Sequence, residues 1–367
     1  MARVDVAVVG GGAMGATAAW RLARSGRSVV LCERFDPVHD RGSSHGATRI
    51  FRVAYRDPRY TDLALRALPL WRELEAATGE VLLEQVGQLD HGRSEAVAEV
   101  ADSLAAAGRP HEVLTPEAAA DRWPGMRFEG SVVMSPDGGR CWAERTVAAA
   151  WRAAGAAGAE LRSRTPVVRM EVRGDRAVLH LPDGEVEADV AVVAAGAWVG
   201  DLLAGLVDLP ALTVEDEQPS HFRPLDPSAE WPSFLHHRPP ADGTDRPLGF
   251  DAYGLLTPGE GVKVGGHGTT AACEPDRRTG VDPGRAAALS AYVAEWFPGL
   301  DPRPVTTTSC LFTTTPDDHF VLDRRGPLVV CSPCSGHGFK FVPAVAREVE
   351  RLVSGEAQPE AAWRLPG

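Results

Sequence analysis

The 367-residue chain predicts an α/β protein: a Rossmann-type nucleotide-binding domain with a second, α+β substrate domain built on a mixed or antiparallel sheet. Three observations support this fold class. The length suits two domains of roughly 150 residues each. An apolar strand followed by the spacing G-x-G-x-x-G opens the chain, as in dinucleotide-binding folds. Two further strand-and-glycine patterns follow, one in the middle of the chain and one near its end.

The opening pattern is a βαβ unit over residues 4–36. Val4 to Val9 is almost wholly apolar, as expected of a strand buried in a parallel sheet. Ala16 to Ser25 has helical periodicity, and Gly26 follows it, a residue type that commonly ends helices. Arg27 to Cys32 then predicts the second strand of the unit.

Three glycines join the first strand to the helix, namely Gly10, Gly12 and Gly15. One makes the tight turn, one lets the backbone approach a pyrophosphate, and one allows close packing of helix on strand. Glu33 lies 18 residues beyond Gly15, near the usual position of a ribose-binding carboxylate. A bare glycine motif also occurs in ordinary loops, but its context here favours dinucleotide binding. The carboxylate disfavours NADP and leaves NAD and FAD open.

The two later patterns can extend the sheet of the first unit. Ala188 to Trp198 reads ADVAVVAAGAW, and Leu328 to Phe341 is an apolar strand that runs into SGHGFKF. A helical segment, Val342 to Leu352, follows the second of them. The nucleotide-binding domain is therefore predicted to be discontinuous.

We expect this domain to comprise residues 1–80, 145–212 and 316–367. The segments between them, residues 81–144 and 213–315, are predicted to form the substrate domain. Residues 213–262 are rich in Pro, Gly, Asp and His, which suggests short strands with long loops. The pair His236-His237 is expected in one of these loops.

Charge and composition exclude several classes of function. The net charge of −12 and pI of about 5.4 disfavour nucleic-acid binding and docking to an anionic membrane. The longest apolar run, around Val190 to Val199, is too short to span a bilayer. The sequence enters an apolar run at Val4 without a charged n-region or cleavage site, so we do not expect export. Six cysteines in such a chain suit a reducing compartment. We expect a cytoplasmic protein.

Residue usage points to a few unusual positions. Lys263 and Lys340 are the only lysines among 38 basic residues, Ile50 is the only isoleucine, and Asn is absent. A GC-rich coding background accounts for the scarcity of all three types. A position that keeps Lys favours a compact ammonium over the planar fork of Arg, although chance survival explains such positions equally well.

Five segments carry a resemblance to a known family. They are the opening GGGAMG, FDPVHDRGSSHGATRIFR (Phe35 to Arg52), GVKVGGH (Gly261 to His267), SCLFTTTPDDHF (Ser309 to Phe320) and SGHGFKF (Ser335 to Phe341). Together, and in this order over essentially the whole chain, they resemble the monomeric sarcosine oxidase and N-methyltryptophan oxidase family of flavoproteins. Both lysines and Ile50 fall inside these segments.

The resemblance implies an FAD enzyme that oxidises a small secondary amine bearing a carboxylate, such as sarcosine or another N-methyl amino acid. O2 would be reduced to H2O2. Cys310 matches the cysteine that forms a thioether to the flavin 8α-methyl group, chemistry that needs a thiolate. His45 and Arg49 match residues against the flavin ring, and Lys263 matches the lysine associated with oxygen activation.

The resemblance also implies a substrate cavity. Arg52 and Lys340 match the pair that binds the substrate carboxylate, Tyr253 and His267 match active-site residues of the cavity, and Ile50 with Leu255 completes the expected substrate contacts. The implied cofactor contacts are Gly10, Gly12, Met14, Gly15, Glu33, Arg34, Ser43, Thr48, Val167, Gly196, Cys310, Gly336, His337, Gly338, Phe339 and Lys340. We expect a monomer that binds no metal, its partners being the amine and O2.

Departures from the family leave the substrate open. Phe312 stands where the sarcosine enzymes commonly have tyrosine, Leu255 replaces an aromatic residue, and the segment Thr213 to Phe222 differs. A cyclic imino-acid oxidase, acting on a pipecolate-, piperideine- or proline-like ring, is the alternative within the family. An NAD-dependent dehydrogenase and a flavoprotein without turnover are the alternatives outside it.

Each assignment also has an ordinary structural explanation. Cys310 can be a small buried hydrophobe, the histidines can be hydrogen-bonded core residues, and the arginines can lie on the surface. Cys331 and Cys334 are interpreted as packing residues, because no second pair completes a zinc site.

Overall fold

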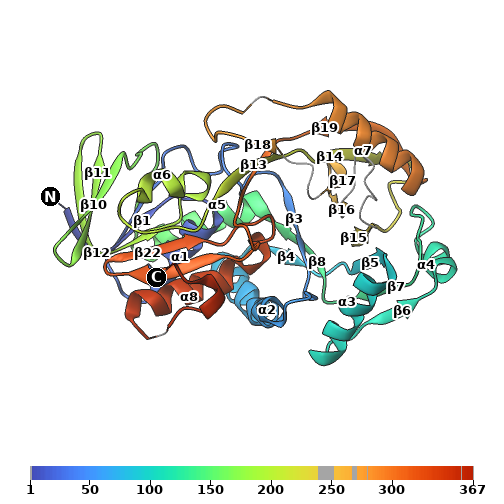
Figure 1. Ribbon diagram of the computed structural model, residues 1–367, viewed down its shortest axis with the longest axis horizontal. Coiled ribbons are helices and arrows are strands. Elements are labelled where there is room, and N and C mark those ends of the chain that lie inside the picture. Colours follow the sequence, from blue (N-terminus) through green and yellow to red (C-terminus); the bar gives the residue numbers. More distant parts are fainter. Residues whose placement is uncertain (1, 239–251, 267–270, 279, 357, 367) are drawn as a thin grey trace.

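The structure is a computed structural model that describes residues 2–238, 252–266, 271–278, 280–356 and 358–366. Two eight-stranded sheets lie at opposite ends of an elongated molecule, with two three-stranded sheets between them (Figure 1). No helix in the described part of the chain combines the length and apolar composition that a membrane crossing requires.

The first large sheet contains all three strand patterns expected from the sequence. Its order is β10 (Arg169–Arg173), β11 (Arg176–Leu181), β12 (Gly184–Val193), β1 (Ala2–Val9), β2 (Val29–Cys32) and β9 (Glu160–Arg162), while β22 (Leu328–Ser332) pairs with β12 and with β21 (Val321–Arg325). The strands β9, β2, β1, β12 and β22 are parallel. The prediction that the chain's start, middle and end share one sheet is confirmed.

Both faces of this sheet are covered, so its strands are apolar on both sides. Val6 and Val8 pack with the helices α1 (Ala13–Arg24), α2 (Pro58–Thr78), α5 (Ala143–Ala156) and α8 (Val342–Ser354). Ala7 and Val9 face the opposite core, which includes Val199 and Leu203 of α6 (Val199–Leu203). The first helix begins at Ala13, three residues before the expected Ala16, because Gly12 is its N-terminal cap.

The second large sheet has the order β19 (Leu300–Thr307), β14 (Ser220–Pro224), β17 (Gly261–Gly266), β16 (Ala252–Thr257), β15 (Ser233–His237), β5 (Gln88–Gly92), β7 (Val132–Ser135) and β6 (Glu112–Leu114). Its ladders are antiparallel except for the parallel pair β15 and β5. The predicted mixed sheet is therefore present. Helices α3 (Ser94–Ala106), α4 (Pro116–Arg122) and α7 (Pro283–Trp296) lie at this end of the molecule (Figure 1).

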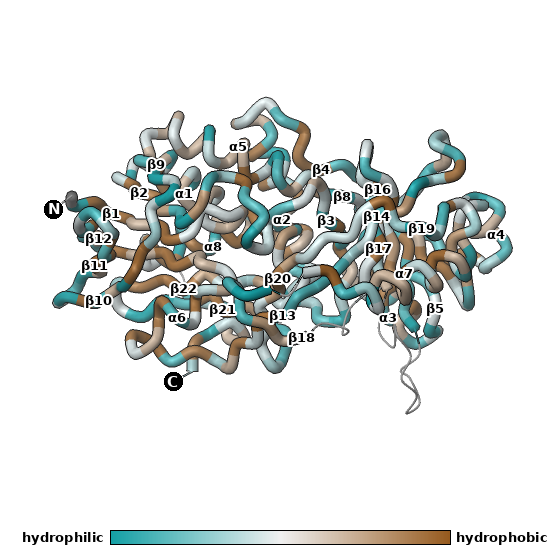
Figure 2. The backbone as a smooth tube through the Cα atoms, turned by 90° about the horizontal axis from the view of Figure 1, so that it is seen from above, coloured by the Kyte–Doolittle hydropathy of each residue, from teal (hydrophilic) through white to brown (hydrophobic). Residues whose placement is uncertain are grey.

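Two small sheets lie between the large ones. One joins β3 (Thr48–Phe51), β8 (Gly139–Trp142) and β4 (Leu83–Glu84). The other joins β18 (Ala271–Ala272), β13 (Thr213–Glu217) and β20 (Cys310–Thr314), and Figure 2 shows it in the middle of the molecule. The two large sheets draw their strands separately from the two predicted sets of segments. The β3–β8 pairing crosses between these sets, so the domain boundaries themselves stay a prediction.

The expectation that His236 and His237 lie in a loop is wrong. Both residues end β15 and are buried. His236 stacks on His91 and bonds Tyr292 and Glu129, while His237 bonds Asp90. Polar partners from neighbouring elements make burial of these imidazoles possible, and a single-sequence pattern does not reveal such partners.

Candidate active site

Two adjoining cavities lie where the sheets meet. The larger, of about 620 Å³, is lined by Val9, Cys32, Ala194 and Ser332, at the carboxyl ends of β1, β2, β12 and β22. Ligands of open α/β sheets bind at this edge. The smaller cavity, of about 130 Å³, is lined by residues of β3, β16, β17 and β20, together with residues of neighbouring strands and of the loop after β22. Arg49, Phe312, Gly336 and Phe339 line both cavities.

The glycine loop leaves space in the larger cavity for a phosphate-bearing ligand. Gly10 has a φ of +96°, and a Cβ there would lie 2.5 Å from the Ala194 carbonyl oxygen. At Gly12, a Cβ would lie 3.2 Å from Ser44 Oγ. Gly15 lines neither cavity, and its Cβ would lie 1.9 Å from the Gly10 carbonyl oxygen. Gly10 and Gly12 therefore form the cradle, whereas Gly15 permits the helix to pack on the strand.

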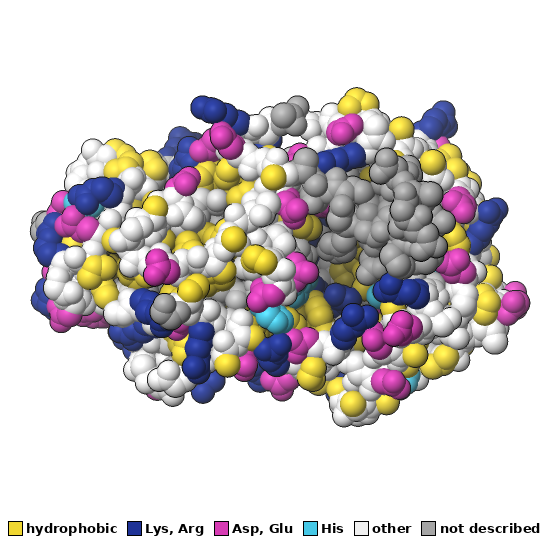
Figure 3. Space-filling model, in the orientation of Figure 1, with side chains coloured by type: hydrophobic (Ala, Val, Ile, Leu, Met, Phe, Trp, Pro, Cys, Tyr) yellow, Lys and Arg dark blue, Asp and Glu magenta, His cyan; other side chains and the backbone are white. Residues whose placement is uncertain are grey.

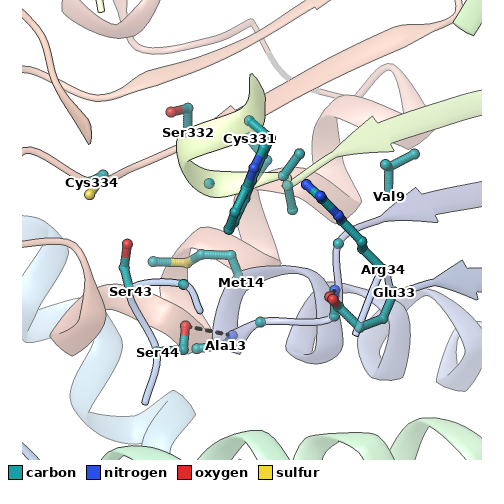
Figure 4. A pocket seen from close by; sticks show the side chains of 18 of the residues that line it. Val9, Ala13, Met14, Glu33, Arg34, Ser43, Ser44, Cys331, Ser332 and Cys334 are labelled. Carbon is teal, nitrogen blue, oxygen red and sulfur yellow. Dashed lines mark hydrogen bonds between the residues drawn. The ribbon is translucent and has the colours of Figure 1, made fainter. Parts of the chain in front are cut away.

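Three side chains hold this loop in place, and two of them, Trp151 and Ser44, were not expected from the sequence. Trp151 Nε1 donates to the Gly11 carbonyl at 2.7 Å, and the Gly11 N–H donates to Glu33 Oε2 at 2.6 Å. Ser44 Oγ accepts from the Ala13 N–H at the start of α1, at 3.1 Å (Figure 4). Trp151 lies on α5, far from the motif in sequence, so no local signal marks it.

Glu33 and Arg34 line one side of the larger cavity, across from Met14, Ser43 and Cys334 (Figure 4). The Glu33 carboxylate is buried and also accepts from the Phe35 N–H at 2.8 Å. It is thereby fixed at the end of β2, where a ribose hydroxyl would meet it. Arg34 lies over the Trp198 ring and pairs with Asp276 at 3.1 Å.

The predicted site residues divide between the two cavities. Those lining the larger one are Gly10, Gly12, Met14, Glu33, Arg34, Ser43, Arg49, Val167, Gly196, Gly336, Gly338 and Phe339. Those lining the smaller one are His45, Thr48, Arg49, Ile50, Arg52, Tyr253, Leu255, Lys263, Cys310, Gly336, His337, Phe339 and Lys340. His267 lies outside the described residues.

Cys310 lies beside the junction of the cavities and is buried. Arg49 Nη2 lies 3.4 Å from Cys310 Sγ and also donates to the Ser43 and His45 carbonyls, at 3.0 and 2.7 Å. These bonds fix the guanidinium beside the Cys310 sulfur. Burial, helped by the charge of Arg49, lowers the pKa of His45 to about 4, so its imidazole is neutral near pH 7.

Lys263 brings an ammonium group to the wall of the smaller cavity. It is buried on β17, and its Nζ donates to the Thr48 carbonyl at 2.9 Å. Burial, with the nearby Arg49 charge, lowers the pKa of Lys263 to about 7. Its ladder neighbours are Leu255 on β16 and His221 on β14. Burial lowers the pKa of His221 to about 4, so this residue, also not expected from the sequence, is neutral near pH 7.

Arg52 and Lys340 make a second positive region in this cavity. Both lie near the ring of Tyr55, with the Arg52 guanidinium carbon 4.1 Å and Lys340 Nζ 5.6 Å from its centre. Lys340 Nζ also donates to the His337 carbonyl at 2.8 Å, and its burial lowers the pKa of the amine. Burial acts to raise the pKa of Tyr55, but the charges of Lys340 and Arg52 outweigh it and lower this pKa. The arrangement suits a carboxylate ligand.

Cys331 and Cys334 both line the larger cavity (Figure 4). None of the six cysteines forms a disulfide. Within the described residues, no cluster of His, Cys, Asp or Glu has the arrangement to hold a metal ion. Cys334 Sγ accepts a hydrogen bond from the Thr313 N–H at 3.1 Å, which ties the loop after β22 to β20.

On the side shown in Figure 3, the charged side chains of the described residues do not indicate a further binding site. Acidic and basic side chains are interspersed over this face. Among the described residues, exposed or half-buried charges form ion pairs such as Arg34 with Asp276. Of the basic residues that line the two cavities, Lys263 and Lys340 are buried in the interior, where screening by salt is weaker.

Comparison with known proteins gives one family for nearly the whole chain. The model of the FAD dependent oxidoreductase family matches residues 5–352. Monomeric sarcosine oxidase from Bacillus sp. (strain NS-129) is 33% identical over 365 residues, which cover 95% of this chain and 92% of that protein. N-methyl-L-tryptophan oxidase from Yersinia pestis (strain Pestoides F) is 27% identical, with 97% and 96% covered.

A similar solved structure is the open form of NikD, described as an unusual amino acid oxidase essential for nikkomycin biosynthesis. It matches with a TM-score of 0.89 and 28% sequence identity, covering 100% of this chain and 98% of that chain. The glycine cradle and the larger cavity suit the FAD that this family binds.

Proposed function

Because the chain belongs to the FAD-dependent oxidoreductase family, together with the monomeric sarcosine oxidases, we propose that it oxidises a small secondary amine that carries a carboxylate. One observation carries this proposal. Arg52 and Lys340 converge on a small cavity that shares a wall with the cofactor cavity. The named activities of the relatives support the same reaction class.

The residues of the chain divide the work of catalysis. Arg52 and Lys340 bind the substrate carboxylate and thereby orient the carbon next to nitrogen, which is a large part of what such a site contributes. Bound FAD supplies the two-electron acceptor for oxidation of the amine to an imine. Lys263, through its ammonium group, stabilises negative charge that develops as O2 is reduced to H2O2. His45 and Arg49 support the attachment of the flavin to Cys310.

A cyclic imino acid is the second candidate substrate. Leu255 and Phe312 give the smaller cavity two apolar walls, against which a pipecolate- or proline-like ring would pack. An NAD-dependent dehydrogenase is no longer proposed, since the family match is to FAD enzymes. We propose that the enzyme works as a cytoplasmic monomer, in keeping with relatives named monomeric.

The purified protein is expected to be yellow, and anaerobic addition of its substrate should bleach the flavin absorbance. Titration with sarcosine, N-methyltryptophan, proline and pipecolate distinguishes the open-chain from the cyclic class, because only a ligand that reduces the flavin bleaches it. Bleaching by a member of either pair supports the amine oxidase and identifies the class. A colourless protein, or one that none of the four bleaches, contradicts the proposal.

Replacing Arg52 with methionine should weaken substrate binding by about 10- to 100-fold, which corresponds to the loss of one charge-assisted hydrogen bond. The Kd from the anaerobic titration checks this. Arg56→Met is the matched control, because Arg56 belongs to the same segment but is exposed and pairs with Glu99. If both substitutions weakened substrate binding equally, Arg52 would not be a ligand of the substrate carboxylate.

A further inference from the structure

Glu217 is a buried acid that the assigned roles leave unused. It ends β13, opposite Cys310 in the β13–β20 ladder, and lines the smaller cavity. Only 2% of the residue is exposed. The sequence analysis marked the segment Thr213 to Phe222 as unusual but did not single out this side chain.

Two neutral donors hold the Glu217 carboxyl. The Gly266 N–H and the Tyr253 hydroxyl reach Oε1 at 3.2 and 3.3 Å. Among the residues that the structure describes, no cation forms an ion pair with Glu217. Such a carboxylate in a cavity wall is costly to bury and attracts a cationic ligand.

The charged and titratable neighbours of Glu217 are engaged elsewhere. Asp216, which precedes it on β13, accepts from Gln218 Nε2 at 2.7 Å, and its backbone carbonyl accepts from Arg285 of α7 at 2.9 Å. Cys310 faces Glu217 from β20, with Arg49 beside its sulfur. The charge of Arg285 acts on Glu217 and lowers its pKa, but it does not outweigh burial.

Burial raises the pKa of Glu217 from 4.5 to about 7, against the opposing hydrogen bonds from Gly266 and Tyr253. Since the folded pKa is the higher one, the unfolded chain releases this proton first as pH rises. Glu217 therefore lowers the free energy of unfolding progressively between pH 4.5 and 7, and the loss is complete above that range. A bound cation would restore this lost stability.

The smaller cavity thus offers both signs of charge to one small ligand. Arg52 and Lys340 suit a carboxylate, and Glu217 suits an ammonium. We propose that Glu217 binds the ammonium of the substrate amino acid and accepts its proton. An N–H bond breaks, the proton moves to a Glu217 oxygen, and the electron pair stays on nitrogen. The neutral amine is the form that can be oxidised. This role rests on the proposed amine oxidase activity.

The experiment compares two unreactive ligands of the same shape on the flavin-loaded enzyme. Glycine betaine carries a quaternary ammonium where 3,3-dimethylbutanoate carries a neutral carbon, and both have the carboxylate. Their Kd values are measured from the change in flavin absorbance at pH 8. The wild-type protein should prefer betaine, and Glu217→Gln should reduce that preference by about tenfold or more. Binding of 3,3-dimethylbutanoate should change less than about threefold.

Glu260→Gln is the matched control, since Glu260 lines the same cavity but is about half exposed, at 46% of its side chain. It should keep the preference for betaine. Glu217→Gln should also raise the melting temperature at pH 8 but not at pH 5, the opposite of what loss of a purely structural hydrogen bond would do. Equal weakening of both ligands would overturn the proposal.

The wild-type protein provides a test that needs no substitution. Its preference for betaine should fall as pH decreases below about 7, because protonated Glu217 no longer attracts a cation. A preference that is constant from pH 5 to 8 would contradict the assignment. These binding measurements involve no turnover, so they separate a failure of this role from a failure of the amine oxidase proposal.

Discussion

Lys263→Met should slow the reaction of the reduced enzyme with O2 by about a hundredfold or more, the scale expected when a preorganised stabilising charge is removed from a buried site. Reduction by the amine should change by less than about fivefold, because Arg52 and Lys340 remain to bind the carboxylate. The expected asymmetry follows from the position of Lys263. Its buried side chain lines the smaller cavity, and its Nζ donates a hydrogen bond to the Thr48 carbonyl.

Stopped-flow spectroscopy measures the two half-reactions separately, one without O2 and one with pre-reduced enzyme. Lys263→Arg serves as a control that keeps the charge, and it should retain more of the oxygen reaction than the methionine variant. The pKa of about 7 sets the expected pH dependence. The ammonium form predominates below that pH, so reoxidation should slow as pH rises through 7. Equal effects of Lys263→Met on both half-reactions would refute the role in oxygen reduction.

Cys310→Ser should convert a flavin that stays with acid-precipitated protein into one that is released completely to the supernatant. A serine hydroxyl is a far weaker nucleophile than a thiolate, so it would not form the bond to the flavin. The absorption spectrum of the pellet and the supernatant checks this result. We expect the variant to fold, because serine is close in size to cysteine and Cys310 is the first residue of β20.

Cys334→Ser is the matched control, since Cys334 lines the larger cavity and accepts a hydrogen bond from Thr313 of β20. It should leave the flavin attached. Retention of flavin by the Cys310→Ser protein would disprove attachment at Cys310. Release of flavin from the Cys334→Ser protein would indicate that the flavin is attached at Cys334 instead. If the flavin of the wild-type protein appeared in the supernatant, the thioether would be disproved, but the amine oxidase proposal would still stand.

The sequence contained strong local signals for the cofactor end of the site. An apolar strand, spaced glycines and Glu33 form one continuous segment, so their spacing alone predicts how they fold together. The two lysines were visible against an arginine-rich background, and both line the smaller cavity. The same reasoning misplaced His236 and His237, because burial of a polar residue depends on partners elsewhere in the chain.

The residues that the sequence analysis missed are joined to the site only by tertiary contacts. Trp151 reaches Gly11 across 140 positions of the chain. Tyr55 lies within residues 1–80, which were predicted to belong to the nucleotide-binding domain. Its role becomes clear only in the fold, where Arg52 and Lys340 both lie against its ring. Glu217 is one acid among 50 Asp and Glu residues, and only the fold shows that it is buried on a cavity wall.

By itself, then, the sequence determined the α/β fold, the dinucleotide cradle and the residue types available for flavin and carboxylate chemistry, because these depend on periodicity and short spacings. Periodicity and spacing did not indicate which of those charges meet; only the family resemblance suggested some of the pairs, and the tertiary structure decided them. It placed Arg52 with Lys340, Arg49 with Cys310, and Glu217 in the same cavity. Burial and distance set the strength of charge interactions, and neither is encoded in the spacing of residues along one chain.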